Sequence, residues 1–296
     1  MRIVIGNRKE IKAGDSSTNI QSENVIIHQH NGLGYTEVKQ IALDVFKSNF
    51  YELSESASKV AVERAEQLVD SFLSKLEKDS PDKVEKIQNP DVQYSVINAQ
   101  MTYARKGEPL TLELLSDLLK KRFQTEEGSL KGIVLNESIN VISKLTINQI
   151  KLITSIFLVK NCQLANARQL IETLSKFLTD DLINFLKDKS YFEHLIFAGI
   201  AANDVSTLSS QNLEFFIRRN YPDELVEKIE GNTLDVLDPP VRKQYITDQL
   251  SESIFNKWND STISQYSLTS VGIAVSVAFY NAVMGTNIDL NIWIKG

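Results

Sequence analysis

The stretch TEVKQIALDVFKSNFYELSESASKVAVERAEQLVDSFLSKLEKD, residues 36–79, decides the fold class. It contains no proline and no glycine, and its apolar residues recur at steps of three and four, the period of an amphipathic helix. We therefore predict a long amphipathic helix over residues 35–79, up to about 40 residues and about 60 Å long, with a possible interruption near residues 49–54. Helices in globular domains seldom reach that length, so we expect it to pack against another subunit or to project from the body.

Residues 82–296 show the same helical period in shorter runs, separated by breaks such as Gly107-Glu108-Pro109 and Pro239-Pro240. Thr146 and Gln149 have the spacing of a capping box, which marks the start of one of these helices. In the segment LTSVG, residues 268–272, the threonine is placed to cap the helix that follows. Short connections are typical of antiparallel helical neighbours, so we predict a multi-helix body that ends in a short strand.

The two ends of the chain differ from this helical centre. Residues 1–30 are polar but rich in β-branched side chains, which predicts two or three short strands anchored by Ile20, Val25 and Ile27. Residues 288–294 alternate apolar and polar side chains, which predicts a strand that carries Ile292, Trp293 and Ile294. The predicted fold is therefore mainly α, with a long N-terminal helix, a multi-helix body and short β-strands at both termini.

The N-terminal strands are too small to be stable alone, because two uncovered strands bury too little apolar surface to offset the ordering entropy. We expect this assembly segment, residues 1–30, to pair with another chain or with the C-terminal strand. Ile20, Val25, Ile27, Ile292, Trp293 and Ile294 are thus the predicted oligomerisation residues. The adhesion would come from main-chain hydrogen bonds, as in strand addition.

The composition is that of an ordinary globular chain of 296 residues, with 42% hydrophobic and 24% charged residues. The net charge of -6 argues against non-specific binding of nucleic acid, which needs a basic face. Cys162 is the single cysteine, as expected in a reducing compartment, and no secretory signal is recognisable near the first residue. We expect a cytoplasmic protein.

Residues 261–288 contain no charged side chain and raise the question of a membrane segment. A spanning helix needs about 20 predominantly apolar residues, whereas this stretch is interrupted by serines, threonines, Gln265 and Asn281. We predict a buried core helix here and keep membrane insertion as the alternative.

The sequence gives no catalytic, cofactor-binding or metal-binding residue. His28 and His30 would share one face of a strand, but no third ligand is near them in sequence. Cys162 has no neighbouring histidine base, and Gly32-Leu33-Gly34 lacks the remainder of a dinucleotide-binding or phosphate-binding motif. We expect no cofactor, and an enzyme is the less favoured class.

Polar residues interrupt one apolar helical run at Asn136-Glu137. An unpaired buried charge is costly, so we predict a structural polar pair between Glu137 and Arg105 or Arg122. If all three side chains converged with no such pairing, they would form an acid site, which is the enzymatic alternative.

Several segments together resemble an uncharacterised bacterial family, and the middle and C-terminal helices are loosely similar to abortive-infection proteins of the alpha type. The N-terminal strand resembles segments on bacterial conflict and phage-defence proteins. The resemblance implies a role in antiviral defence and assigns no catalytic residue. The segments are GDSSTNIQ (14–21), LGYTEV (33–38), ALDVF (42–46), NF (49–50), VLNE (134–137), KLT (144–146), LTSVGIA (268–274) and IWI (292–294).

The leading hypothesis is a self-assembling, non-enzymatic interaction protein in bacterial anti-phage defence. Its expected partners are further copies of itself and a phage or host protein, with no nucleic acid. The alternative is a membrane-active effector that releases residues 261–288 from the core, and only this alternative includes a membrane.

Overall fold

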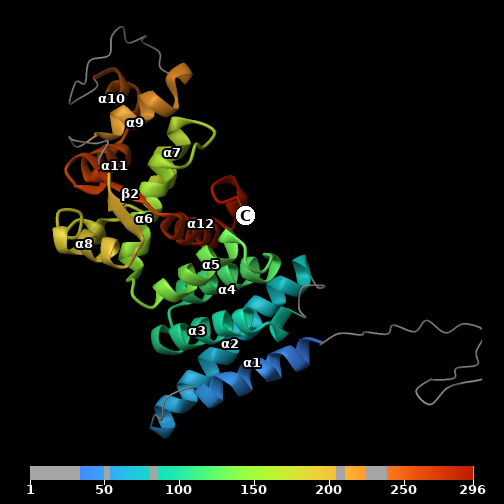
Figure 1. Cartoon of the computed structure of the whole chain (residues 1–296). Coiled ribbons are helices and arrows are strands. Elements are labelled where there is room, and N and C mark those ends of the chain that lie inside the picture. Colours follow the sequence, from blue (N-terminus) through green and yellow to red (C-terminus); the bar gives the residue numbers. More distant parts are fainter. Residues whose placement is uncertain (1–33, 50–53, 81–85, 205–210, 225–238, 296) are drawn as a thin grey trace, which may run out of the picture.

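A computed structural model describes residues 34–49, 54–80, 86–204, 211–224 and 239–295. These residues form a mainly α-helical molecule, as predicted (Figure 1). The helices are α1 (Tyr35–Asn49), α2 (Glu55–Asp79), α3 (Pro90–Lys106), α4 (Pro109–Gln124), α5 (Leu130–Ile142), α6 (Ile147–Lys160), α7 (Ala167–Leu174), α8 (Lys189–Phe197), α9 (Leu213–Asn220), α10 (Pro239–Tyr245), α11 (Gln249–Asn259) and α12 (Ser270–Met284).

Helices α1–α5 lie together at one end of the molecule, and α6–α11 lie at the other end (Figure 1). Helix α12 joins the two groups, because it packs against α4 and α5 on one side and α6 on the other. Residues 274–281 of α12 are all buried. The charge-free segment therefore supplies the predicted core helix. None of the described helices is both long enough and apolar enough to cross a bilayer.

The long amphipathic helix predicted over residues 35–79 is divided at the interruption that the sequence indicated near residues 49–54. The chain forms two helices there, and α1 folds back against α2 (Figure 1). Ser54, at the start of α2, has an extended backbone with φ -56° and ψ 152°. The hairpin buries Val38, Ala42 and Phe46 of α1 completely or nearly so. An uninterrupted helix in a single chain would leave these side chains in water, which explains the break.

The prediction of a C-terminal strand is wrong, because residues 290–292 form a short 3-10 helix. Two side chains satisfy the local backbone in place of a strand neighbour. The Asp289 carboxylate accepts a hydrogen bond from the backbone N–H of Asn291, at 2.9 Å. The Asn281 side-chain oxygen accepts one from the N–H of Ile288, also at 2.9 Å. Such local bonds compete with a strand ladder.

The sheet of the described region is small, and both of its strands lie in the second half of the chain. Strands β1 (Ala201–Asn203) and β2 (Tyr266–Leu268) pair antiparallel, with Ala202 opposite Ser267. Lys160 joins this pair to α6, because its amino group donates to Asp204 at 2.8 Å and to the carbonyl oxygens of Ser264 and Tyr266. The predicted N-terminal strands, residues 1–30, lie outside the described residues.

The predicted helix starts at residues 146 and 269 are confirmed. Thr146 and Gln149 form a reciprocal capping box at α6. The Thr269 hydroxyl accepts from the N–H of Gly272 at 3.2 Å and donates to the carbonyl of Gly199 at 2.7 Å. Gly272 itself leaves room for a close approach, since a β-carbon there would lie 2.2 Å from the carbonyl oxygen of Ile200. The LTSVG segment is thus a helix start that fits closely against the end of β1.

Candidate interaction surface

Arg122 is the buried centre of a polar cluster that links three helices. Only 1% of its surface is exposed, and its guanidinium contacts the carboxylate of Asp91 on α3. Its Nε donates to the side-chain oxygen of Asn136 on α5, at 2.8 Å. The Asn136 amide nitrogen donates in turn to Asp91, at 2.9 Å. The cluster therefore holds the start of α3 and the middle of α5 at the end of α4.

The predicted pairing of Glu137 with Arg105 or Arg122 is wrong. Glu137 and Arg105 are both exposed, and the buried Arg122 takes its carboxylate partner from Asp91. The helical period explains the error, because position 136 faces α3 and α4 while position 137 is turned outward by about 100°. The acid site built from Glu137, Arg105 and Arg122 does not form.

The predicted C-terminal oligomerisation residues are divided between the core and the surface. Ile294 is buried, and Trp293 packs edge-on against Phe157 with ring centres 5.0 Å apart. The Trp293 indole N–H donates to the carbonyl of Asn161 at 2.7 Å. Ile292 is 67% exposed and is free to contact a partner. Ile20, Val25 and Ile27 lie outside the described residues.

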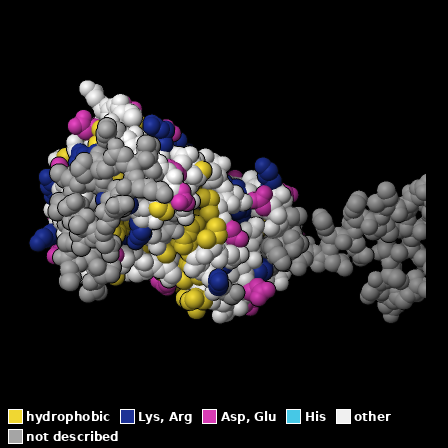
Figure 2. Space-filling view, turned by 90° about the horizontal axis from the view of Figure 1, so that it is seen from above, with side chains coloured by type: hydrophobic (Ala, Val, Ile, Leu, Met, Phe, Trp, Pro, Cys, Tyr) yellow, Lys and Arg dark blue, Asp and Glu magenta, His cyan; other side chains and the backbone are white. Residues whose placement is uncertain are grey.

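Two further exposed apolar side chains lie on the helix that contacts this C-terminal turn. Leu130 and Ile133, in the first turn of α5, are 58% and 57% exposed. Lys131 between them donates to the side chain of Asn291 at 2.7 Å and lies 3.7 Å from the carboxylate of Asp289. We call Leu130, Ile133 and Ile292 the α5 surface. Hydrophobic side chains gather in a band on the face seen from above in Figure 2.

Sequence reasoning missed Leu130 and Ile133. The run Ile133-Val134-Leu135 carries more apolar residues than one helix face can bury, and this excess was the available signal. Isolated apolar residues on a protein surface are common, whereas apolar residues from separate segments that lie close together mark interaction sites more often.

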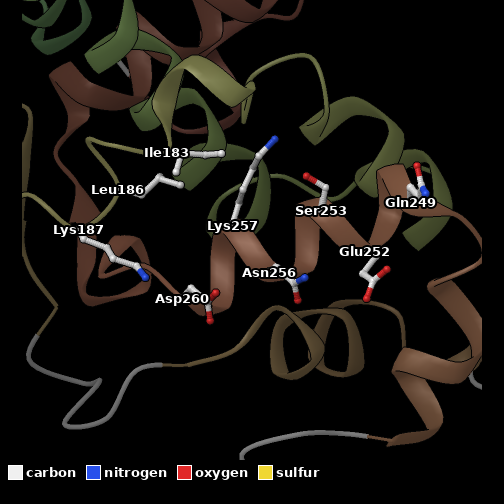
Figure 3. A pocket seen from close by; sticks show the side chains of 9 residues that line it. All are labelled: Ile183, Leu186, Lys187, Gln249, Glu252, Ser253, Asn256, Lys257 and Asp260. Carbon is white, nitrogen blue, oxygen red and sulfur yellow. The ribbon is translucent and has the colours of Figure 1, made fainter.

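A groove of about 380 Å³ runs along the outer face of α11 (Figure 3). One wall is the segment 183–187, which contributes Ile183, Leu186 and Lys187. The other wall consists of polar side chains of α11 and the residue after it: Gln249, Glu252, Ser253, Asn256, Lys257 and Asp260.

The groove has polar groups but no catalytic arrangement. The amino group of Lys257 already donates to the carbonyl of Leu178 at 2.9 Å and lies 2.6 Å from the carboxylate of Asp180. No histidine or cysteine lines this groove. Ser253 therefore has no histidine base among the lining residues, and the charges present suit a polar ligand or a protein contact.

The remaining chemical candidates also have ordinary roles. Burial raises the pKa of the Cys162 thiol to about 11, so it is protonated at neutral pH and a poor nucleophile. The His194 ring nitrogen Nδ1 lies 2.9 Å from the side-chain nitrogen of Gln149. Within the described part of the chain, His, Cys, Asp and Glu side chains form no group suited to a metal. His28 and His30 lie outside it.

These features define a mainly α-helical protein with an apolar surface and a polar groove. A model of an uncharacterised protein family matches residues 32–250 and 240–294. The chain belongs to this family. Its N-terminal segment, residues 1–30, precedes the matched region. Neither the curated proteins nor the solved structures contain a significant match.

Proposed function

We propose that the protein is a non-enzymatic interaction protein that assembles with copies of itself through the α5 surface, in the cytoplasm of a bacterial cell. The observation that carries the proposal is the exposure of Leu130 and Ile133 in the first turn of α5, together with that of Ile292 in the C-terminal turn that Lys131 contacts. A two-fold axis through this surface would bring the same apolar residues of two chains together, which is the commonest form of homodimer.

The test is a single charge in the centre of the α5 surface. Ile133→Asp places a carboxylate in the contact, where burial without a partner is costly. We therefore expect the dissociation constant of the dimer to rise at least about tenfold. Size-exclusion chromatography with light scattering measures the assembly at micromolar concentration. Phe197→Asp is the matched control, because Phe197 is 80% exposed on α8, far from α5 along the chain.

Two results would contradict this proposal. One is a wild-type protein that stays monomeric over the whole concentration range, and the other is an Ile133→Asp protein that assembles as the wild type does. Deletion of residues 1–30 tests separately whether Ile20, Val25 and Ile27 contribute to the adhesion. A loss of assembly in that variant alone would transfer the contact from the α5 surface to the N-terminal segment.

The cellular role that we propose is defence against phage, which follows from the sequence resemblance of the N-terminal strand segment and the helices. Phage plating on cells that express the wild type or the Ile133→Asp variant tests it. We expect protection by the wild type and loss of protection in the variant. Equal plating on cells with and without the wild type would exclude the role for the phages used.

The second candidate function is a membrane-active effector that uses residues 261–288. Helix α12 has 15 residues and thus spans about 22 Å, which is less than the roughly 30 Å of a bilayer core. Its release would also expose the buried residues 274–281. Leakage of dye-loaded liposomes on addition of the protein would favour this function over the first.

A further inference from the structure

Helix α1 packs against a surface that α2 and α3 form together, which we call the α1 seat. Phe46 is fully buried among three alanines, Ala61 and Ala65 of α2 and Ala104 of α3. One and two turns earlier, Ala42 and Val38 enter the main core. The small side chains of α2 and α3 thus leave a space between them, and a side chain of α1 fills it.

The polar contacts of the α1 seat lie at its outer edge. Lys39 lies 2.9 Å from the carboxylate of Glu66 and 2.8 Å from that of Asp70, and the Tyr35 hydroxyl donates to Asp70 at 2.8 Å. These groups are partly exposed, and exposed ion pairs contribute little to stability. They therefore specify the register of α1 on α2 but contribute little to the free energy of its packing.

The underside of the seat contains an unsatisfied group. Gln100 of α3 is fully buried, and neither its amide oxygen nor its amide nitrogen has a hydrogen-bond partner. It borders a space lined by Ile41, Ala42 and Val45 of α1, which is too narrow for a water molecule. A buried amide without a partner is costly, so the contact of α1 with α3 is weaker than its apolar area suggests.

The sequence between α1 and α2 permits a second arrangement. Residues 36–79 contain no helix breaker, and the Ser54 side chain makes no capping hydrogen bond to α2. The contacts 35–70 and 39–66 are both symmetric about residues 52–53. Two uninterrupted helices that cross antiparallel at this point would therefore repeat the same contacts between two chains.

We propose that α1 exchanges between two copies of the chain, so that α1 of one copy occupies the α1 seat of the other. This inference rests on the proposed self-assembly and names a second contact for it. The occupant is defined by the structure, since the chain's own α1 already fits the seat. Exchange keeps the contacts of Phe46 with the alanines and adds the backbone hydrogen bonds of a continuous helix, against the entropy of association.

The test uses two substitutions at Ser54 with opposite effects. Ser54→Ala favours a continuous helix, because alanine has the highest helix propensity, and we expect it to increase exchange several-fold. Ser54→Pro fits the observed φ of -56° and keeps the hairpin, but proline is strongly disfavoured inside a helix. We expect it to decrease exchange about a hundredfold.

Exchange is measured by cross-linking between different copies, in a Cys162→Ala background. One protein carries Lys39→Cys alone and the other carries Glu66→Cys alone, and the two are mixed with a short bis-maleimide. A covalent heterodimer forms only if α1 of one copy lies on α2 of the other. The control mixture combines Lys39→Cys with Glu137→Cys on α5, and circular dichroism confirms that every variant is folded.

The outcomes separate this inference from the proposed function. A heterodimer that increases in Ser54→Ala and disappears in Ser54→Pro supports exchange. If light scattering shows dimers but the Lys39→Cys and Glu66→Cys proteins do not cross-link even with Ser54→Ala, exchange is wrong and self-assembly stands. If every variant is monomeric at all concentrations, the proposed self-assembly and the exchange are both wrong.

Discussion

Asp91 is the exposed member of the cluster around Arg122, and its ionisation links stability to pH. Burial alone would raise the pKa of Asp91, but hydrogen bonds from Arg122 and Asn136 outweigh burial and lower it below the usual 3.8. A lowered folded-state pKa contributes stability above pH 3.8, and this contribution is lost as the pH falls through the folded-state value.

Replacement of this carboxylate therefore has a predictable result. Asp91→Asn leaves the buried Arg122 without a charged partner, so we expect the free energy of unfolding at pH 7 to fall by about 1–3 kcal/mol. The difference between variant and wild type should shrink below pH 3.8. Urea unfolding at pH 7 and at acidic pH measures both effects. Glu137→Gln, on the exposed side of α5, should change stability by less than about 0.5 kcal/mol.

Gln100 gives a prediction of opposite sign. Gln100→Met keeps the approximate shape of the side chain and removes the unpaired amide, so we expect stability to rise by about 1 kcal/mol. Gln100→Glu should lower it, because a buried carboxylate has no partner there either. Thermal unfolding of both variants checks the pair. A Gln100→Met protein that is less stable than the wild type would show that the amide is satisfied in solution.

At the scale of elements, the helices of the body were accessible from sequence because their signals are local. The capping box of Thr146 and Gln149 and the cap of Thr269 depend on residues a few positions apart. The boundary between α1 and α2 was marked only as an interruption near residues 49–54. The chain turns there because Val38 and Phe46 become buried against helices that are distant in the sequence. A local sequence pattern does not reveal that contact.

The C-terminal strand was wrongly predicted because a strand needs a partner strand, which a local pattern does not reveal. Alternation over residues 288–294 satisfies the local rule for a strand, but no described strand offers an edge beside it, and Asp289 and Asn281 bind the backbone instead. Strands β1 and β2 are three residues long and were missed, because such short runs have no measurable period. The pairing of Arg122 with Asp91 was missed as well, because the two residues are 31 positions apart in the chain.

The close fit of α12 against β1 gives the prediction at this scale. Alanine normally stabilises a helix relative to glycine, but Gly272→Ala places a β-carbon 2.2 Å from the carbonyl oxygen of Ile200. We expect a loss of about 2 kcal/mol or more, measured by urea unfolding. Gly34→Ala is the control, since its β-carbon would meet only the Glu37 carboxylate, at an ordinary 3.8 Å. Equal stabilities of the two variants would contradict the close fit.

At the scale of the whole molecule, assembly through the α5 surface would make apparent stability depend on protein concentration. Ile133→Asp alters an exposed residue, so the isolated chain should unfold as the wild type does at low concentration. Only the part of the concentration dependence of the unfolding temperature that comes from the α5 surface should disappear. The mainly α class was predictable from composition and period, whereas the α5 surface required the contact between Lys131 and Asn291, 160 positions apart.

The position of Trp293 has a practical consequence. The chain has two tryptophans, and Trp258 is fully buried on α11. Trp293 is partly exposed and directly follows Ile292. A chain with Trp258→Phe would therefore emit light from a single indole beside the α5 surface. Its emission would shift to shorter wavelength when a partner excludes water from that indole, and the shift would report each docking event without an attached dye.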